Sequence, residues 1–258
     1  MHRAYYEGNL KLKKFDIKDL RCPHRHSIQS HPACFMKGLV KYPDPKTFEK
    51  YTGKPWYEYS DDNGNPLLRI GFFDIEVDDL KPDRGMVLTW AIKERNGNVI
   101  TSYITRQEIF DGVFDKRVVQ EFVDAISKFD ILVGYYSSRF DINFMRARAM
   151  YHNIEFPSMS YCKDEKGEYK LKPEIIHWDI YYIVRNKLGL SRNSLANSTQ
   201  FLGIPGKTPI DFSYWMKARF GDKKCIEIVL EHNIADVEIT EKLWERLTPY
   251  KKWIKSPL

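Results

Sequence analysis

A short apolar run that carries two acidic residues constrains the fold of this chain more than any other feature. Residues 67–77 (LLRIGFFDIEV) are almost continuously apolar, which is typical of a strand buried at the centre of a sheet. Asp74 and Glu76 lie two residues apart within it, and the period of a strand places both on one face. Two like charges side by side in a buried setting repel each other and are costly to remove from water. We therefore expect one of two arrangements at this face. Either a divalent cation binds there, which would be Mg²⁺ or Mn²⁺ because these ions prefer oxygen ligands, or the face meets solvent.

The segments after this run predict a mixed sheet covered by helices. Residues 86–93 and 99–105 read as strands joined by a turn at Asn96-Gly97, which is a strong hairpin signal. Further along, the patterns predict a helix at 118–129, a strand at 131–135, a helix at 141–151, a strand at 175–179, and helices at 180–187, 194–201, 214–220 and 222–247. The last of these exceeds a typical helix length, so the sequence leaves open whether it is broken. The predicted fold class is α/β, with three antiparallel strands, then parallel strands, and helices on the faces.

The first quarter of the chain differs from the rest in charge and composition. The whole chain has a net charge of +6, and residues 1–69 hold 13 basic against 8 acidic side chains. Its Pro- and Gly-rich stretch favours irregular structure over helix. A length of 258 residues allows one large domain or one domain with a small appendage. We predict a basic N-terminal extension at 1–66 and a folded domain at 67–258.

A cluster of cysteine and histidine residues lies within the predicted extension. Two thiolates and two imidazoles could bind zinc there, but the spacing matches no standard zinc pattern, and a solvated basic loop with free cysteines is the alternative. Adjacent arginines make a nucleic-acid contact a third interpretation. The cluster consists of Cys22, His24, His26, His31 and Cys34.

Several classes of protein are not expected. No apolar run reaches the roughly 18–20 residues of a transmembrane helix, and the first residues (MHRAYYEGNLKLKK) lack the apolar segment of a secretory signal. The 4 cysteines are too sparse for a disulfide framework. We therefore expect an intracellular, cytoplasmic protein without a membrane partner.

Two further segments carry acidic residues in positions suited to chemistry. In residues 134–144 (GYYSSRFDINF), a strand leads into a helix and Asp141 falls near the helix start, where the helix dipole favours a carboxylate. In residues 232–237 (HNIADV), His232 and Asp236 are four apart and share one helix face. A histidine beside metal-binding carboxylates could serve as a general base. The alternatives are a capping acid at Asp141 and an exposed His–Asp pair.

Taken in order, these three segments resemble the DEDD superfamily of 3′–5′ exonucleases. D-x-E in a strand, G-Y-x-S-x-x-F-D at a helix start and N-x-x-D-V in the last helix are similar to the proofreading exonuclease domain of family B DNA polymerases and to stand-alone relatives. The resemblance covers about residues 68–248. It implies an RNase H-like fold in which Asp74, Glu76, Asp141 and Asp236 meet at one end of the sheet and hold two divalent ions. Such a pair activates water and stabilises the leaving oxygen of a phosphodiester.

The chain departs from the family pattern at two positions. His232 lies four residues before Asp236, a spacing at which one subclass of the family has tyrosine, whereas the histidine subclass has its histidine five residues before. We expect His232 to orient or deprotonate the attacking water. Val77 stands where relatives usually place a threonine that touches the 3′ end, so engagement of the substrate there is expected to differ.

The second segment also supplies candidates for binding the substrate through base stacking or phosphate contacts. These candidates are Tyr135, Tyr136, Arg139, Phe140 and Asn143. Packing in the core is the alternative for Tyr135 and Phe140. Asp179, which follows a predicted strand, either contacts the surroundings of the site or caps the next helix.

The resemblance implies a metal-dependent 3′–5′ exonuclease that hydrolyses single-stranded DNA ends to nucleoside monophosphates with Mg²⁺ or Mn²⁺. The alternatives are an RNA-directed exonuclease, a structure-selective endonuclease on the same fold, and a non-catalytic nucleic-acid-binding module. The expected partner is the 3′ end of single-stranded DNA, with RNA as the alternative, and a replication or repair protein is a further expected partner. Because only about ten residues follow the last predicted helix, we expect a stand-alone nuclease or a subunit. The basic extension is the candidate for gripping the nucleic-acid backbone.

Overall fold

A computed structural model describes residues 69–129, 131–157, 161–163, 169–171, 175–206 and 210–248. These residues fall into two compact units. The larger unit comprises Ile70–Ser158 and Ile175–Leu258, and the other contains Met159–Glu174. The predicted zinc cluster and the predicted extension at 1–66 lie outside the described residues, so both stay predictions, as does the domain boundary at residue 67.

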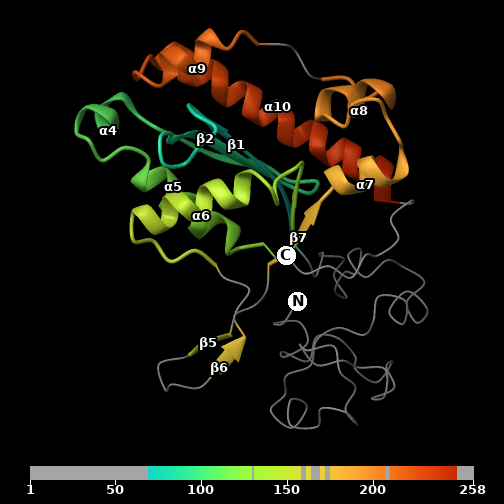
Figure 1. The fold of residues 1–258 in the computed structure, drawn as a ribbon, viewed down its shortest axis with the longest axis horizontal. Coiled ribbons are helices and arrows are strands. Elements are labelled where there is room, and N and C mark those ends of the chain that lie inside the picture. Colours follow the sequence, from blue (N-terminus) through green and yellow to red (C-terminus); the bar gives the residue numbers. More distant parts are fainter. Residues whose placement is uncertain are drawn as a thin grey trace. The chain divides into compact units, whose positions relative to one another are not determined.

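The larger unit is built on a mixed sheet, which confirms the predicted fold class. Its strands are β1 (Ile70–Val77), β2 (Val87–Glu94), β3 (Val99–Tyr103), β4 (Ile131–Gly134) and β7 (Ile176–Asp179). In the described residues their order is β3-β2-β1-β4-β7. The pairs β1–β2 and β2–β3 are antiparallel, whereas β1–β4 and β4–β7 are parallel. The strand with the two carboxylates is therefore the central one (Figure 1).

Helices cover both faces of this sheet. Among the described residues, the helices of this unit are α4 (Arg106–Phe110), α5 (Lys116–Ile126), α6 (Asp141–Tyr151), α7 (Tyr181–Lys187), α8 (Leu195–Phe201), α9 (Ser213–Ala218) and α10 (Lys223–Leu247). Helix α10 crosses one face, and α5 and α6 lie on the other (Figure 1). Although its length left this open, α10 is one unbroken helix of 25 residues. It contains no Gly or Pro, and Asp222 caps its start by accepting a hydrogen bond from the Cys225 amide.

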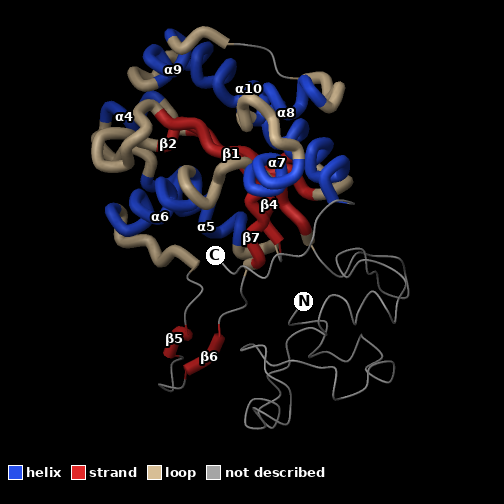
Figure 2. The backbone as a smooth tube through the Cα atoms, turned by 45° about the vertical axis from the view of Figure 1, so that its right-hand side comes forward, coloured by secondary structure: helices blue, strands red, loops and turns tan. Residues whose placement is uncertain are grey.

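The central strand is buried from both sides, which explains why its sequence is almost continuously apolar. Phe72 contacts Trp244 of α10 with ring centroids 5.5 Å apart. The next residue, Phe73, contacts Phe122 of α5 with centroids 6.0 Å apart. Successive side chains of a strand point to opposite faces, so β1 packs against a helical layer on each side (Figure 2).

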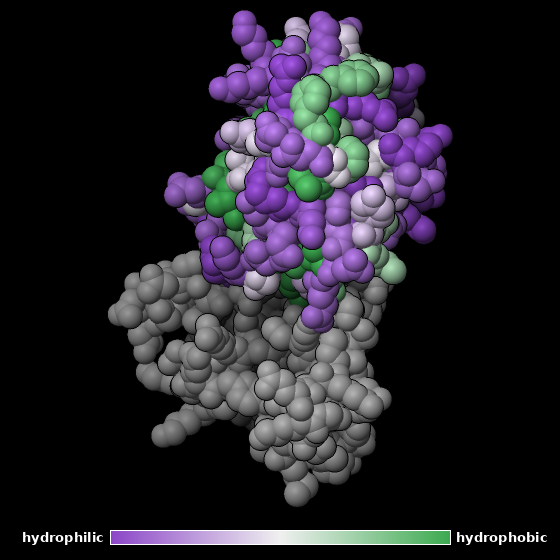
Figure 3. Space-filling model, turned by 90° about the vertical axis from the view of Figure 1, so that its left-hand side faces the viewer, coloured by the Kyte–Doolittle hydropathy of each residue, from purple (hydrophilic) through white to green (hydrophobic). Residues whose placement is uncertain are grey.

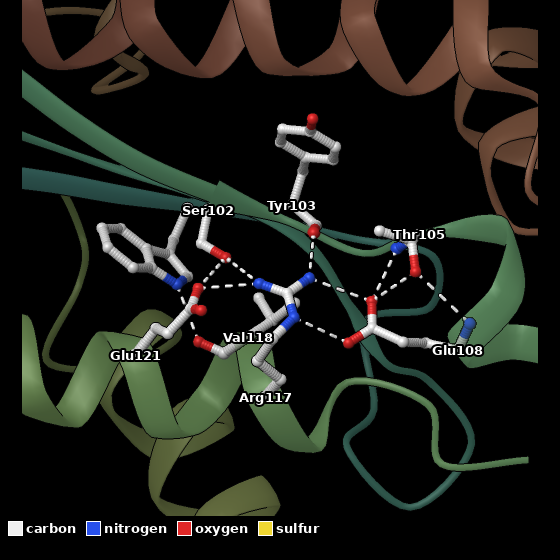
Figure 4. A network of polar contacts seen from close by, with 8 residues as sticks. Ser102, Tyr103, Thr105, Glu108, Arg117, Val118 and Glu121 are labelled. Carbon is white, nitrogen blue, oxygen red and sulfur yellow. Dashed lines mark hydrogen bonds and ion pairs between the residues drawn. The ribbon is translucent and has the colours of Figure 1, made fainter.

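Polar contacts around Arg117 fasten β3 to the helices that follow it (Figure 4). The Arg117 guanidinium donates to both carboxylate oxygens of Glu108, at 2.8 and 2.9 Å, and to the Tyr103 carbonyl at 2.8 Å. It also donates to Glu121 at 2.8 Å. Glu108 and Thr105 form a capping box at the start of α4. The sequence did not predict α4, because this helix has no buried residue and so no apolar periodicity.

A buried ionic cluster joins the start of α5 to α6 and β2. Asp115 is fully buried and accepts hydrogen bonds from Arg148 at 2.6 and 2.9 Å and from the Val87 amide at 2.8 Å. His152 Nε2 lies 2.7 Å from the same carboxylate. Burial raises the pKa of Asp115, but the hydrogen bonds from Arg148, Val87 and His152 outweigh it and hold the pKa below its usual value.

The other unit contributes a short hairpin to the described residues, and its strands were not predicted. It pairs β5 (Tyr161–Lys163) with β6 (Tyr169–Leu171) in antiparallel fashion. Strands of 3 residues give too short a pattern to be distinguished from loop.

The surface of the described residues is mainly hydrophilic on the face that Figure 3 shows, with apolar residues in small groups. Within the described ranges, no helix has both the length and the apolar character needed to cross a membrane.

Candidate metal centre

The two carboxylates of β1 lie on the face predicted from the strand period. Asp74 and Glu76 are partly exposed, whereas Phe73, Ile75 and Val77 between and around them are buried. The ladder between β1 and β4 is recorded only for residues 70–72 of β1. Asp74 and Glu76 therefore lie on the part of β1 that extends past its parallel neighbour.

Asp141 joins this part of β1 through the backbone. It is the first residue of α6, and its Oδ1 accepts a hydrogen bond of 3.2 Å from the Ile75 amide, midway between the two carboxylates of the strand. Burial raises the pKa of Asp141 to about 7, with the nearby Asp179 carboxylate adding to the shift. Water thus stabilises the charged form of Asp141 poorly, and a bound cation is a physical means of doing so.

Helix α10 supplies the residues that face β1. Asn233 Nδ2 donates to Asp74 Oδ2 at 2.7 Å, and Asn233 Oδ1 accepts from Thr89 on β2 at 3.2 Å. His232 Nε2 lies 3.8 Å from Glu76 Oε1 and 3.9 Å from Asp236 Oδ2. Asn233 therefore sets the orientation of Asp74 on the sheet side of the helix, beside the imidazole.

Three residues bring possible ligand atoms together. Glu76, His232 and Asp236 each offer one atom, and these atoms lie within 4.8 Å of one another. An octahedral Mg²⁺ holds ligands at about 2.1 Å, so ligand atoms lie about 3.0 Å apart when adjacent and about 4.2 Å apart when opposite. The separations of 3.8 and 3.9 Å from His232 Nε2 to the two carboxylates are longer than the adjacent spacing. The group is therefore near the size of a divalent cation site, and its atoms would have to draw closer to bind one octahedral ion together.

The donor atoms of this group have different metal preferences. Carboxylates suit Mg²⁺ and Mn²⁺, whereas imidazole suits softer metals. Among the described residues, the possible ligands that lie this close together are Glu76, His232 and Asp236. Asp74 and Asp141 are not part of this group. Asp74 accepts a hydrogen bond from Asn233, the residue after His232. Asp141 accepts one from the amide of Ile75, the residue before Glu76. The assignment of all four carboxylates as metal ligands stays a prediction.

Trp215 is a contact of this site that the sequence did not indicate. Its indole Nε1 donates to Glu76 Oε2 at 2.8 Å, and its ring meets the His232 ring edge to face with centroids 5.5 Å apart. The indole thus occupies one oxygen of Glu76 while the other oxygen faces His232. A lone tryptophan in a short helix carries no sequence signal for such a contact, because it reads as a core residue.

Asp179 holds the turn that leads into α6. Its carboxylate accepts from the amides of Tyr136 and Ser138 at 2.8 and 3.0 Å, and from the Ser138 hydroxyl at 2.5 Å. It also accepts from the Tyr181 amide at the start of α7 at 3.1 Å. Asp179 thus contacts the surroundings of Asp141 and accepts from the first amide of α7. It is not the cap residue of that helix, because the cap position is Ile180 and makes no side-chain cap hydrogen bond. The turn needs this support because Tyr136 has a φ of 60°, which is unfavourable for a side chain of its size.

His177 lies behind the turn. It is buried, and its Nε2 lies 2.8 Å from the Ser137 hydroxyl. Burial lowers the pKa of His177 to about 4, although the Asp179 carboxylate acts in the opposite direction. Gly134 is required here, because a Cβ at this position would lie 2.2 Å from Ser137 Oγ. The glycine of the second motif therefore allows Ser137 to pack into the interior.

The predicted substrate-binding residues fall into two groups. Tyr136, Arg139 and Asn143 are exposed and could reach a ligand. Tyr135 is partly buried, and its hydroxyl donates to the Asn193 carbonyl at 2.6 Å. Phe140 packs against the core. Burial raises the pKa of Tyr135 to about 12, so this residue acts as a neutral hydrogen-bonding bridge toward the segment before α8.

The fold and the carboxylates on its central strand define the class of protein. A five-stranded mixed sheet in the described residues, with acidic side chains at the end of β1 and on a crossing helix, is the architecture of RNase H-like proteins. The RNase H superfamily matches residues 71–248. This chain belongs to the RNase H superfamily.

Two similar proteins come from archaea. A DNA polymerase of Methanocaldococcus jannaschii is 24% identical over 206 residues, which cover 71% of this chain and 12% of the polymerase. The solved structure of the family B DNA polymerase from Pyrobaculum calidifontis matches with a TM-score of 0.55 and 22% identity, over 74% of this chain and 26% of that one. The chain thus spans only a small part of the length of these polymerases. These findings confirm the predicted relationship to an RNase H-like domain with similarity to family B DNA polymerases.

Proposed function

We propose that this chain is a metal-dependent 3′–5′ exonuclease that hydrolyses the ends of single-stranded DNA to nucleoside monophosphates. The observation that supports this most strongly is that two carboxylates, Glu76 and Asp236, and the imidazole of His232 lie within 4.8 Å of one another, which brings candidate metal ligands and a candidate general base together. It occurs on a fold whose superfamily suggests a nuclease-type hydrolase. The similarity to DNA polymerases favours DNA as the substrate.

The roles of the residues follow from their positions. Glu76 and Asp236 would hold divalent metal, with Asp74 and Asp141 completing a two-ion site. Bound Mg²⁺ or Mn²⁺ supplies Lewis acidity to the phosphodiester and lowers the pKa of water. His232 lies between Glu76 and Asp236 at 3.8 and 3.9 Å, from where its imidazole orients the attacking water and accepts its proton.

The surroundings of the carboxylates support this arrangement. Asn233 and Trp215 each donate to one carboxylate oxygen, of Asp74 and Glu76 respectively. Residues that orient metal ligands keep them in place and increase metal affinity. The exposed side chains of Tyr136 and Arg139, near Asp141, would contact the DNA substrate. A replication or repair protein as a further partner is a proposal that rests on the similarity to polymerases.

Labelled oligonucleotides test the proposed function. With Mg²⁺ or Mn²⁺, a 5′-labelled single strand should give a descending ladder, and a 3′-labelled strand should release labelled mononucleotide at once. Asp236→Asn should abolish both. Glu238→Gln is the matched control, because this acid is exposed on the same helix two residues away and should retain activity.

Two further substrates separate the alternatives. A circular single strand should stay intact, because it has no 3′ end, and its cleavage would favour an endonuclease. Faster degradation of RNA than of DNA of the same sequence would favour the RNA-directed alternative. Undiminished activity in Asp236→Asn would contradict the assignment of the site.

A further inference from the structure

An aromatic pair extends outward from the candidate metal centre. Phe212, which precedes α9, stacks on Trp215 with the ring planes 13° apart and the centroids 6.3 Å apart. The Phe212 side chain is 64% exposed. Its ring therefore presents an apolar surface to solvent on the side of Trp215 away from the core.

The inner member of the pair is fixed to the carboxylates. Trp215 donates to Glu76 at 2.8 Å and meets the His232 ring edge to face at 5.5 Å. Helix α9 also packs against α10, which carries His232. Phe212 is thus two ring contacts away from the imidazole, on a segment that is held in place by the site itself.

Scattered exposed apolar residues are normal on protein surfaces and need no explanation. Phe212 differs because its ring stacks on Trp215, and the Trp215 indole donates to Glu76 at the candidate metal centre. Bases of single strands bind to aromatic rings of this kind, and every base offers a face for stacking, so the contact tolerates any sequence. A nucleobase carries no negative charge, so it can lie near the carboxylates without repulsion. The phosphate of the nucleotide is negatively charged and would need a metal ion to offset the repulsion from the carboxylates.

We propose that Phe212 is a stacking platform for an unpaired nucleobase of the strand whose phosphate lies at the metal centre. This inference rests on the proposed function, since it assumes a nucleic-acid strand at the carboxylates. Trp215 sets the position and tilt of the platform relative to Glu76. The ligand class is a single-stranded nucleic acid with at least one base unstacked from its neighbours.

Fluorescence of 2-aminopurine tests the platform directly, because stacking on an aromatic ring quenches it. The base is placed in turn at each of the last four positions of a single-stranded DNA with phosphorothioate linkages, which keep the strand intact. Full-length wild type, Phe212→Ala, Phe212→Trp and Phe220→Ala are compared with Mn²⁺ present. Phe220 is the matched control, since it is a phenylalanine 71% exposed just beyond the same short helix.

The expected result is quenching at one position in wild type that is lost in Phe212→Ala and kept in Phe212→Trp and Phe220→Ala. Phe212→Ala should also bind the strand about 5-fold to 150-fold more weakly, as loss of one base–aromatic stack implies. Equal quenching in Phe212→Ala and wild type would overturn the proposal, and so would an equal loss in Phe220→Ala. If wild type neither binds nor degrades the strand, it is the proposed function that fails.

Discussion

The hydrogen bond from Trp215 to Glu76 leads to a prediction that separates metal binding from stability. Replacing Trp215 by phenylalanine keeps an aromatic ring against His232 but removes the donor that lies 2.8 Å from Glu76 Oε2. We expect weaker metal binding in Trp215→Phe, because Glu76 Oε2 then loses the donor that orients it.

The magnitude follows from the contact and its exposure. A hydrogen bond to a charged group contributes about 1.5–3 kcal/mol. The Glu76 side chain keeps 16% of its surface exposed, so water replaces part of the lost contact. The lower end of the range, about 1.5 kcal/mol, corresponds to slightly more than tenfold in affinity. This agrees with the roughly 10–100-fold effects of residues that orient metal ligands.

The assay is titration with Mn²⁺, followed by the electron paramagnetic resonance signal of the free ion, alongside urea unfolding of the same samples. Trp90→Phe is the matched control, because the Trp90 indole also donates over 2.8 Å, but to the Val118 carbonyl in the core. Trp215→Phe should lose about tenfold in Mn²⁺ affinity with little loss of stability. Trp90→Phe should lose about 1 kcal/mol of stability and keep its Mn²⁺ affinity. Unchanged affinity in Trp215→Phe, or an equal loss in both variants, would show that the Trp215 hydrogen bond does not orient Glu76 for metal.

Three further predictions concern the supports of the site and the core. Asp115→Asn leaves Arg148 with a buried charge and should lower the free energy of unfolding by about 3 kcal/mol in urea, whereas Glu121→Gln at the exposed Arg117 pair should cost under about 1 kcal/mol. Asp179→Asn should speed amide hydrogen exchange at Tyr136 and Ser138 by about tenfold, and unchanged exchange would contradict its role in the turn. His177 has a folded pKa of about 4, below its usual 6.5, so the unfolded chain takes up its proton first as the pH falls. The stability from neutral His177 is therefore complete above pH 6.5 and is lost toward pH 4. The difference in urea midpoint between wild type and His177→Asn should change over this pH range.

The sequence predicted the sheet well, because its strands are buried and strongly patterned. Within the run at 67–77, Ile70–Val77 form β1, and the Asn96-Gly97 turn joins β2 to β3 as expected. Elements without such a pattern were missed. Helix α4 has no buried residue, and the hairpin of β5 and β6 has strands of only 3 residues. The sequence did not decide whether α10 is broken, because helix propensity alone does not show that one helix crosses the sheet.

For the candidate site, the sequence predicted which carboxylates share a face but not what orients them. The period of two in β1 was sufficient for Asp74 and Glu76, and the helical period for His232 and Asp236. Asn233 stands within the third motif, yet its contact with Asp74 depends on how α10 crosses β1. Trp215 reaches Glu76 across 139 positions of sequence, and no local pattern encodes such a contact.

The central claim is that divalent metal binds between β1 and α10. Anomalous diffraction from a crystal of the chain soaked in Mn²⁺ tests it most directly. We expect a peak within coordination distance, about 2.2 Å, of Glu76 and Asp236, and a second peak between Asp74 and Asp141 when a DNA strand is bound. A peak that lies elsewhere in the molecule, with none at Glu76 and Asp236, would contradict it.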